Sequence, residues 1–250
     1  MRLGLIGDTH GYLPALEAAI RGCKAAGVDR IIHCGDFLSV PFSPDPPDEN
    51  IALLRAEAVT AVYGNGEVYF MHWGTPHWES TLAQRMRRPD PPGAWLAMVA
   101  EGQAAISAEN LAWLRQLPGE LALDCARPGD VYVCHAMPGD PFSTIWDGDA
   151  KYNPPFTRNE IEQALARSLV ANADLILCGH VPYPLVQRTA LPNGRTALVI
   201  RGVGWMRGAP DGTGWTTDFW VLENKGPASN GFRAWEMERH VVEFRPRVSG

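Results

Sequence analysis

The chain has 250 residues, of which 46% are apolar and 20% charged, and its formal net charge is −6 at pH 7. This composition is that of an ordinary globular protein long enough to bury a full core and short for two independent domains, so we expect residues 1–250 to form one domain. The negative charge argues against general binding to nucleic acid or to an anionic membrane, and no apolar run is long enough to cross a bilayer. The five cysteines are scattered and lack a C-x-x-C pair, which favours reduced core thiols and a cytoplasmic location.

The first predicted element is a short strand that ends in two candidate metal ligands. The apolar run 2–6 ends at Gly7, and Asp8-Thr9-His10-Gly11 follows it. Residues 15–26 then show the apolar spacing of a helix. A carboxylate and an imidazole that leave one strand end can reach a common point, and such a pair suits a divalent metal ion. Because D-x-H also occurs by chance, its meaning depends on whether the pattern recurs.

The same construction does recur along the chain. Four further apolar runs are predicted strands that each lead to a polar residue: 28–34 to Asp36, 59–63 to Asn65, 130–134 to His135 and 174–178 to His180. In layered α/β proteins ligands gather beyond the carboxyl ends of the strands, so these side chains can converge on one place. Six oxygen and nitrogen ligands without a thiolate exceed the need of one metal ion and indicate two ions that share a carboxylate, about 3.5–4 Å apart.

The remaining elements are predicted from periodicity and turn residues. Helices are expected over 51–58, 110–117 and 157–171, a proline-rich loop over 37–50, and strands over 196–200, 219–223 and 235–244. Between residues 68 and 109 the pattern favours no particular element.

The order of these motifs resembles that of the calcineurin-like metallophosphoesterases, in the branch of small bacterial and archaeal phosphodiesterases. The family pattern is D-x-H, G-D, G-N-H-[DE], a histidine after a strand, and G-H-x-H. It is matched by GDTHG at 7–11, GD at 35–36, GNGE at 64–67, CHAMP at 134–138 and GHVP at 179–182. The resemblance implies an α/β fold, a four-layer αββα sandwich of two mixed β-sheets flanked by helices.

The resemblance also implies the role of each ligand. Asp8 and His10 would hold the first metal ion, Asp36 would bridge both ions, and Asn65, His135 and His180 would hold the second. Two manganese ions are expected, with iron, zinc or nickel as alternatives. Asp36, Asn65 and His10 would be catalytic, and Asn65 would also bind the substrate, while a hydroxide that bridges the metals attacks phosphorus.

Two positions depart from the family pattern. Gly66 stands where the G-N-H histidine, a proposed general acid or charge stabiliser, is expected, and His10 is a candidate substitute. Pro182 replaces the second histidine of G-H-x-H, and proline has no side-chain donor atom. We therefore expect weaker binding of the first metal ion. A further hypothesis is that His72 or His77 supplies the missing ligand.

These motifs predict a metal-dependent phosphoesterase, and a phosphodiesterase in particular, that acts on a small phosphorylated molecule such as a nucleotide. Two alternatives stay open: a serine/threonine phosphoprotein phosphatase of the same fold, and a non-catalytic scaffold on a degenerate metal site. The motifs of serine hydrolases, P-loop enzymes and zincins are missing from the sequence.

Overall fold

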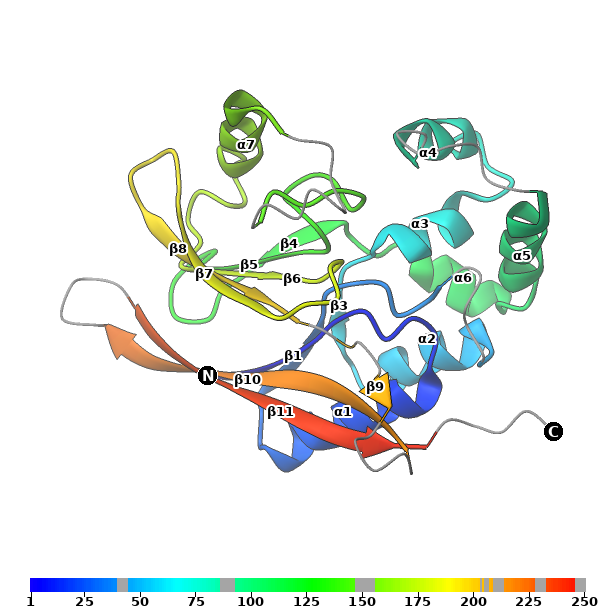
Figure 1. Ribbon diagram of the computed structural model, residues 1–250, viewed down its shortest axis with the longest axis horizontal. Helices are drawn as coiled ribbons and strands as arrows, with labels where there is room; N and C mark the ends of the chain where they lie inside the picture. The colour runs from blue at the N-terminus through cyan, green and yellow to red at the C-terminus, as the bar shows by residue number, and fades with distance from the viewer. Residues whose placement is uncertain are drawn as a thin grey trace.

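Two mixed β-sheets lie face to face at the centre of the computed structural model (Figure 1). The structure describes residues 1–39, 45–85, 93–146, 156–202, 204, 207–208, 214–227 and 233–245. The first sheet contains β1 (Arg2–Ile6), β2 (Arg30–His33), β3 (Thr60–Ala61), β9 (Arg207–Gly208), β10 (Trp215–Pro227) and β11 (Arg233–Phe244). The second sheet contains β4 (Glu120–Leu123), β5 (Val131–Cys134), β6 (Leu175–Cys178), β7 (Leu185–Ala190) and β8 (Thr196–Arg201).

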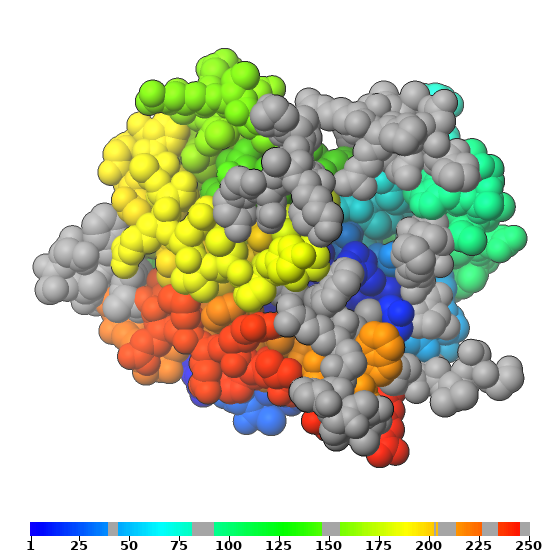
Figure 2. Space-filling view, viewed as in Figure 1, coloured from blue at the N-terminus to red at the C-terminus, as the bar shows by residue number. Residues whose placement is uncertain are grey.

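Each sheet contains three neighbouring parallel strands. The first sheet runs β11-β10-β1-β2-β3, with β9 beside β10, and β1, β2 and β3 are parallel. The second runs β4-β5-β6-β8-β7, and β5, β6 and β8 are parallel. Parallel neighbours end at the same edge, so the loops after β1, β2 and β3 lie together, as do those after β5 and β6. On the molecular surface the dark-blue N-terminal residues lie next to the yellow segment that follows β6 (Figure 2).

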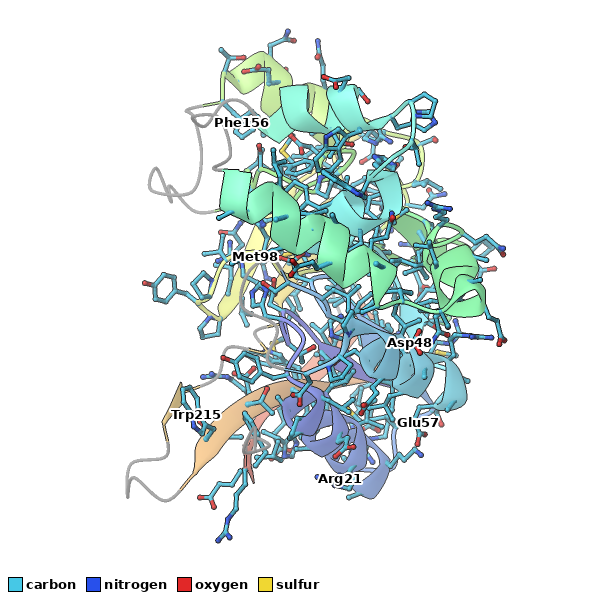
Figure 3. All side chains as sticks on the ribbon, turned by 90° about the vertical axis from the view of Figure 1, so that its right-hand side faces the viewer. Arg21, Asp48, Glu57, Met98, Phe156 and Trp215 are labelled. Carbon is cyan, nitrogen blue, oxygen red and sulfur yellow. The ribbon has the colours of Figure 1, made fainter. Side chains whose placement is uncertain are left out.

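Helices form the two outer layers. They are α1 (Leu13–Ala25), α2 (Pro47–Ala56), α3 (Asn65–His72), α4 (Trp78–Arg85), α5 (Gly93–Ala104), α6 (Ala108–Leu114) and α7 (Arg158–Leu165). α1 and α2 cover the outer face of the first sheet, and α7 covers that of the second. In the side view, Arg21 of α1 and Phe156 next to α7 lie at opposite ends of the stack (Figure 3). No helix in the described ranges has the length and apolarity needed to span a bilayer.

Strand alternation explains the layering. In β5, Val131 and Val133 pack into the core between the sheets, whereas Tyr132 and Cys134 point to the opposite face and pack with Leu165 of α7. A strand buried on both faces needs an apolar residue at every position, which is how these runs read in the sequence. The predicted αββα sandwich is therefore confirmed.

Some predicted boundaries are wrong. Residues 37–50 are not a loop throughout, because α2 begins at Pro47. Proline is tolerated in the first turn of a helix, since the N–H that it lacks has no partner within the helix there. The helix predicted over 157–171 ends at Leu165. The chain then turns so that Val170 and Ala173, both fully buried, enter the core ahead of β6.

The core between the sheets should carry much of the stability. Leu177 of β6 is fully buried there, so we expect Leu177→Ala to lower the free energy of unfolding by about 2–5 kcal/mol through lost burial and a cavity. The matched control Leu169→Ala, at a side chain that is 39% exposed, should stay within about 0.5 kcal/mol. Urea denaturation of both variants measures this, and equal losses would contradict the assignment of the core.

Candidate metal centre

The six predicted ligands come from loops at the carboxyl ends of strands in both sheets. Asp8 and His10 follow β1, and Asp36 follows β2. Asn65 is the first residue of α3, directly after the loop that leaves β3, while His135 follows β5 and His180 follows β6. The structure brings all of them together beyond the strand ends, as the sequence predicted for a layered α/β protein.

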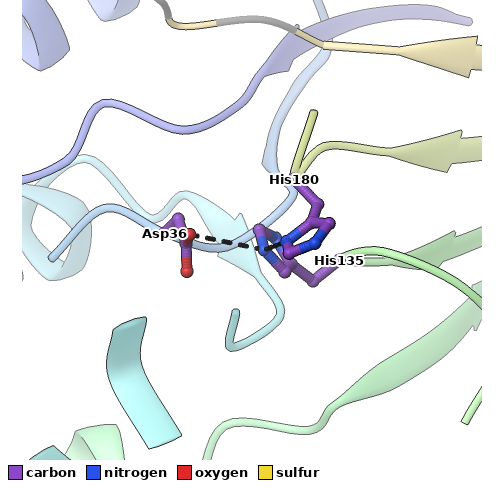
Figure 4. A group of neighbouring side chains, drawn as sticks. All are labelled: Asp36, His135 and His180. Carbon is purple, nitrogen blue, oxygen red and sulfur yellow. Dashed lines mark hydrogen bonds and ion pairs between the residues drawn. The ribbon is translucent and has the colours of Figure 1, made fainter. Parts of the chain in front are cut away.

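Two groups of ligand atoms share one carboxylate. Asp8, His10 and Asp36 form one group, and Asp36, His135 and His180 form the other; within each group the ligand atoms lie within 4.8 Å of one another. Asp36 Oδ2 lies 3.5 Å from His135 Nε2 and 4.0 Å from His10 Nδ1. Figure 4 shows the Asp36 carboxylate facing the two imidazoles of the second group. A carboxylate shared between two sets of nitrogen and oxygen ligand atoms is an arrangement that could hold two metal ions close together.

Asn65 completes the second group. Its Oδ1 lies 2.9 Å from His180 Nδ1 and 3.2 Å from His135 Nε2, and these two ring nitrogens are 3.3 Å apart. Three donor atoms on separate elements therefore face one point.

A hydrogen bond to the backbone fixes the orientation of the His135 ring. Its Nδ1 donates to the carbonyl oxygen of Cys34 at 2.7 Å, so Nε2 is the atom turned toward the site. Burial lowers the pKa of His135, but the carboxylate of Asp36 outweighs this and raises the pKa to about 9. A proton thus holds the place where a cation would bind, and metal binding would release it.

The buried carboxyl groups leave the site short of positive charge. Burial raises the pKa of Asp8 to about 7, and the charge of Asp36 adds to the rise while His135 opposes it. Burial acts upward on Asp36 too, yet His135 holds its pKa below the ordinary value. Burial and the charge of Asp36 raise the pKa of Glu67 to about 8. Divalent cations would relieve this crowding, so the donors and the charge both fit such a group.

The backbone at the site is held in an uncommon conformation. Four of the predicted ligands have positive φ angles: Asp8 (39°), His10 (48°), Asp36 (54°) and His180 (74°). Non-glycine residues seldom adopt this left-handed region, and it persists only where surrounding structure enforces it. The strain coincides with the ligands, as is common at functional sites.

Comparison with known proteins assigns the family. Residues 1–211 match the family model described as the calcineurin-like phosphoesterase superfamily domain. The chain belongs to this family. Members of the calcineurin-like family are metal-dependent phosphoesterases, in agreement with the resemblance seen in the sequence.

Individual members of the calcineurin-like family share only a short aligned stretch or a low sequence identity with this chain. Phosphodiesterase MJ0936 of Methanocaldococcus jannaschii is 33% identical over 67 residues, a stretch that covers 27% of this chain and only 37% of that protein. A metallophosphoesterase from Sphaerobacter thermophilus has 21% identity and a TM-score of 0.61, over 98% of this chain and 90% of that one. The hypothetical protein PH1004 from Pyrococcus horikoshii OT3 has 16% identity and a TM-score of 0.59, over 99% and 89%. The two structures establish likeness of fold.

Glu67 of the calcineurin-like GNGE segment is the site residue that the sequence analysis missed. Its fully buried carboxylate accepts three backbone N–H bonds: Oε2 from Asp36 and Gly64, both at 2.7 Å, and Oε1 from Leu38 at 2.6 Å. Glu67 therefore ties the loop after β2 to the start of α3 and positions both Asp36 and Asn65. One feature of the sequence could have indicated this role. Glu67 lies three residues after Gly64, which is the capping-box position at the start of a helix.

The close approach of the loop after β2 explains why a glycine occupies position 66. Its N–H donates to Asp36 Oδ1 at 2.7 Å, and a Cβ at this position would lie 2.5 Å from the carbonyl oxygen of Leu38. The backbone of the loop after β2 therefore occupies the space beside the α-carbon. The histidine of the calcineurin-like pattern cannot be restored here without moving that loop.

The hypothesis that His72 or His77 supplies a ligand is not supported. His72 Nδ1 lies 2.5 Å from Thr81 Oγ1, and the rings of His72 and His77 contact each other at 5.4 Å between centroids. Across the described ranges, neither residue belongs to the two ligand groups. The Asp8 group thus has three ligands, whereas the His135 group has four with Asn65.

The Glu67 contacts predict a stability effect. Glu67→Gln replaces one acceptor oxygen by an NH₂ group that faces a backbone N–H, and we expect a loss of about 1–3 kcal/mol in the free energy of unfolding of the metal-free protein. Glu160→Gln is the matched control, since Glu160 holds the same capping-box position in the exposed α7, and its effect should stay within about 0.5 kcal/mol. Urea denaturation measures both. Equal effects would show that Glu67 is only a helix cap.

The close packing at Gly66 predicts a second effect. Gly66→Ala forces a methyl group against the Leu38 carbonyl. We expect it to lower the free energy of unfolding by about 1–3 kcal/mol. Gly93→Ala, at the start of α5 with no neighbour within 4 Å of the added Cβ, should be neutral or stabilising. Thermal and urea unfolding compare the two variants. A Gly66→Ala protein as stable as the wild type would mean that the loop after β2 can move to admit the methyl group without loss of stability, which contradicts the prediction.

Proposed function

We propose that this chain hydrolyses phosphodiesters of small molecules with the help of two divalent cations, manganese foremost. The observation that carries the proposal is the shared Asp36, whose carboxylate belongs to both ligand groups. The ligands are carboxylates, imidazoles and an amide, which suit manganese, iron, zinc or nickel. When bound, such a pair of cations would lower the pKa of a bound water and neutralise charge on the phosphoryl group.

The protein's own side chains would bind and orient the ester. Asn65 starts α3 and is partly exposed, so its amide NH₂ can donate to a phosphoryl oxygen while Oδ1 faces the histidines. His10 has a side chain that is 27% exposed beside Asp36. Its ring can therefore reach an ester on the open side and donate a hydrogen bond from a ring N–H to the leaving-group oxygen. Asp36 is almost fully buried and would act by holding the cations.

One observation bears on the leaving group of the substrate and one on the class of ester. The closed loop beside Gly66 leaves no room for the imidazole that would assist a poor leaving group, so substrates with a better leaving group suit this site. The curated relative from M. jannaschii is named a phosphodiesterase, although it aligns over 67 residues only. The three-ligand group of Asp8 should bind its cation more weakly than the four-ligand group of His135.

The central experiment is hydrolysis of bis-p-nitrophenyl phosphate and of the p-nitrophenyl monoester with added manganese. We expect the diester to be the better substrate. Asp36→Asn should lower kcat/KM at least about 100-fold, because one change weakens both cation sites. His72→Ala, outside both ligand groups, is the control and should retain wild-type activity.

The same assay separates the alternatives. Activity on phosphopeptides alone would indicate a phosphoprotein phosphatase. A well-folded wild-type protein that neither binds manganese nor turns over any ester would indicate a scaffold. Full activity in Asp36→Asn would contradict the shared-carboxylate proposal directly.

A further inference from the structure

A hollow lies beside the loop that leaves β5, the strand that leads to His135. It has a volume of about 300 Å³ and lies between α7 and the loop that follows β5. We call it the α7 pocket; its walls include Met137, Pro138, Asp140, Phe156, Gln163 and Arg167. Met137 is two residues beyond His135, and two residues span at most about 7 Å, so one short loop carries both a predicted metal ligand and a wall of the pocket.

The α7 pocket is held open by a polar network. The carboxylate of Glu120 accepts from the Tyr132 hydroxyl at 2.6 Å, from the Gly139 N–H at 2.9 Å and from the guanidinium of Arg167. Arg167 is thereby fixed to β4 and to the loop, while its side chain stays 45% exposed. The loop itself is braced by reciprocal backbone hydrogen bonds between Met137 and Asp140. The pocket is therefore largely preformed, which lowers the cost of binding a ligand.

The charges of the α7 pocket exclude a phosphate group. Among the described residues that line it, Arg167 is the only cation, and it is already paired with Glu120. Asp140 and Glu160 also line the pocket, so carboxylates outnumber guanidinium groups. A dianion would be repelled here, whereas an uncharged ligand would not.

The remaining groups suit a planar ring with a polar edge. Met137, Pro138 and Phe156 offer apolar contact, and methionine sulfur and an aromatic ring both pack well against flat rings. The exposed amide of Gln163 and the guanidinium of Arg167 offer donors, and the amide oxygen an acceptor. Nucleobases present this combination of a flat apolar face and a hydrogen-bonding edge.

We propose that the α7 pocket binds the uncharged nucleoside part of a phosphoester whose phosphate lies at the metal centre. The inference deepens the proposed function and rests on it for the position of the phosphate. His135 and the pocket residue Met137 lie two residues apart on one loop, so the proposal requires a substrate that extends along this loop from the metal ligand to the pocket. Substrates would thus be selected by the part of the molecule that does not react.

A binding experiment tests the pocket without any catalysis. Metal-free full-length protein is dialysed against adenosine, guanosine, cytidine and uridine in turn. We expect at least one nucleoside to bind, and Gln163→Ala to weaken its binding about three- to tenfold, the effect of one or two neutral hydrogen bonds. Glu162→Ala is the matched control, since Glu162 is the adjacent residue of α7, pairs with Arg158 and does not line the pocket.

Kinetics with two esters tests the link to the metal centre. Thymidine 5′-p-nitrophenyl phosphate and methyl p-nitrophenyl phosphate share a leaving group, but only the first has a nucleoside. Gln163→Ala should raise KM for the nucleoside ester about three- to tenfold with kcat unchanged, and should leave the methyl ester unaffected.

The outcomes are separable. Gln163-dependent binding of a nucleoside by a protein that hydrolyses no ester would support the pocket and refute the proposed function. Failure of all four nucleosides to bind, or equal binding by Gln163→Ala and Glu162→Ala, would overturn the pocket while leaving the hydrolase intact. Tighter binding of inorganic phosphate than of any nucleoside, abolished by Arg167→Leu, would overturn the charge argument.

Discussion

Asp36 must sit where two ligand groups overlap, and several features of the chain serve that placement. Its carboxylate faces His135 and His10 with one oxygen and accepts the Gly66 N–H with the other. Its backbone has a φ of 54°, and its own N–H donates to Glu67. The loop after β2 is thus held by the start of α3, which is near because β2 and β3 are parallel neighbours.

The site concentrates unfavourable local energy that the rest of the fold must offset. Left-handed backbone at four ligands costs on the order of 1–3 kcal/mol each, and buried carboxyl groups add desolvation. The strands that form the apolar core between the sheets lead directly into these loops. The well-packed core and the strained ligand loops are therefore joined at the strand ends. Bound cations would compensate part of the electrostatic cost, and the protein should therefore be most stable when loaded with metal.

Much of the architecture could be predicted because each ligand follows a short, mainly apolar run that ends in glycine or directly at the ligand. Other features depend on long-range contacts. The role of Glu67 rests on the N–H groups of Asp36 and Leu38, which are 31 and 29 residues away in the chain. Helix α5 was missed because its exposed face carries Met98 and its sequence shows little contrast between faces. The α7 pocket required knowing that Arg167 meets Glu120 across 47 residues.

The central claim is that one carboxylate serves two cations. Its most direct measurement is the anomalous difference density of crystals soaked in manganese. The account predicts two peaks, about 3.5–4 Å apart on either side of the Asp36 carboxylate, with the peak beside His135 and His180 stronger than the one beside Asp8. A single peak at full occupancy, or peaks that do not touch Asp36, would contradict it.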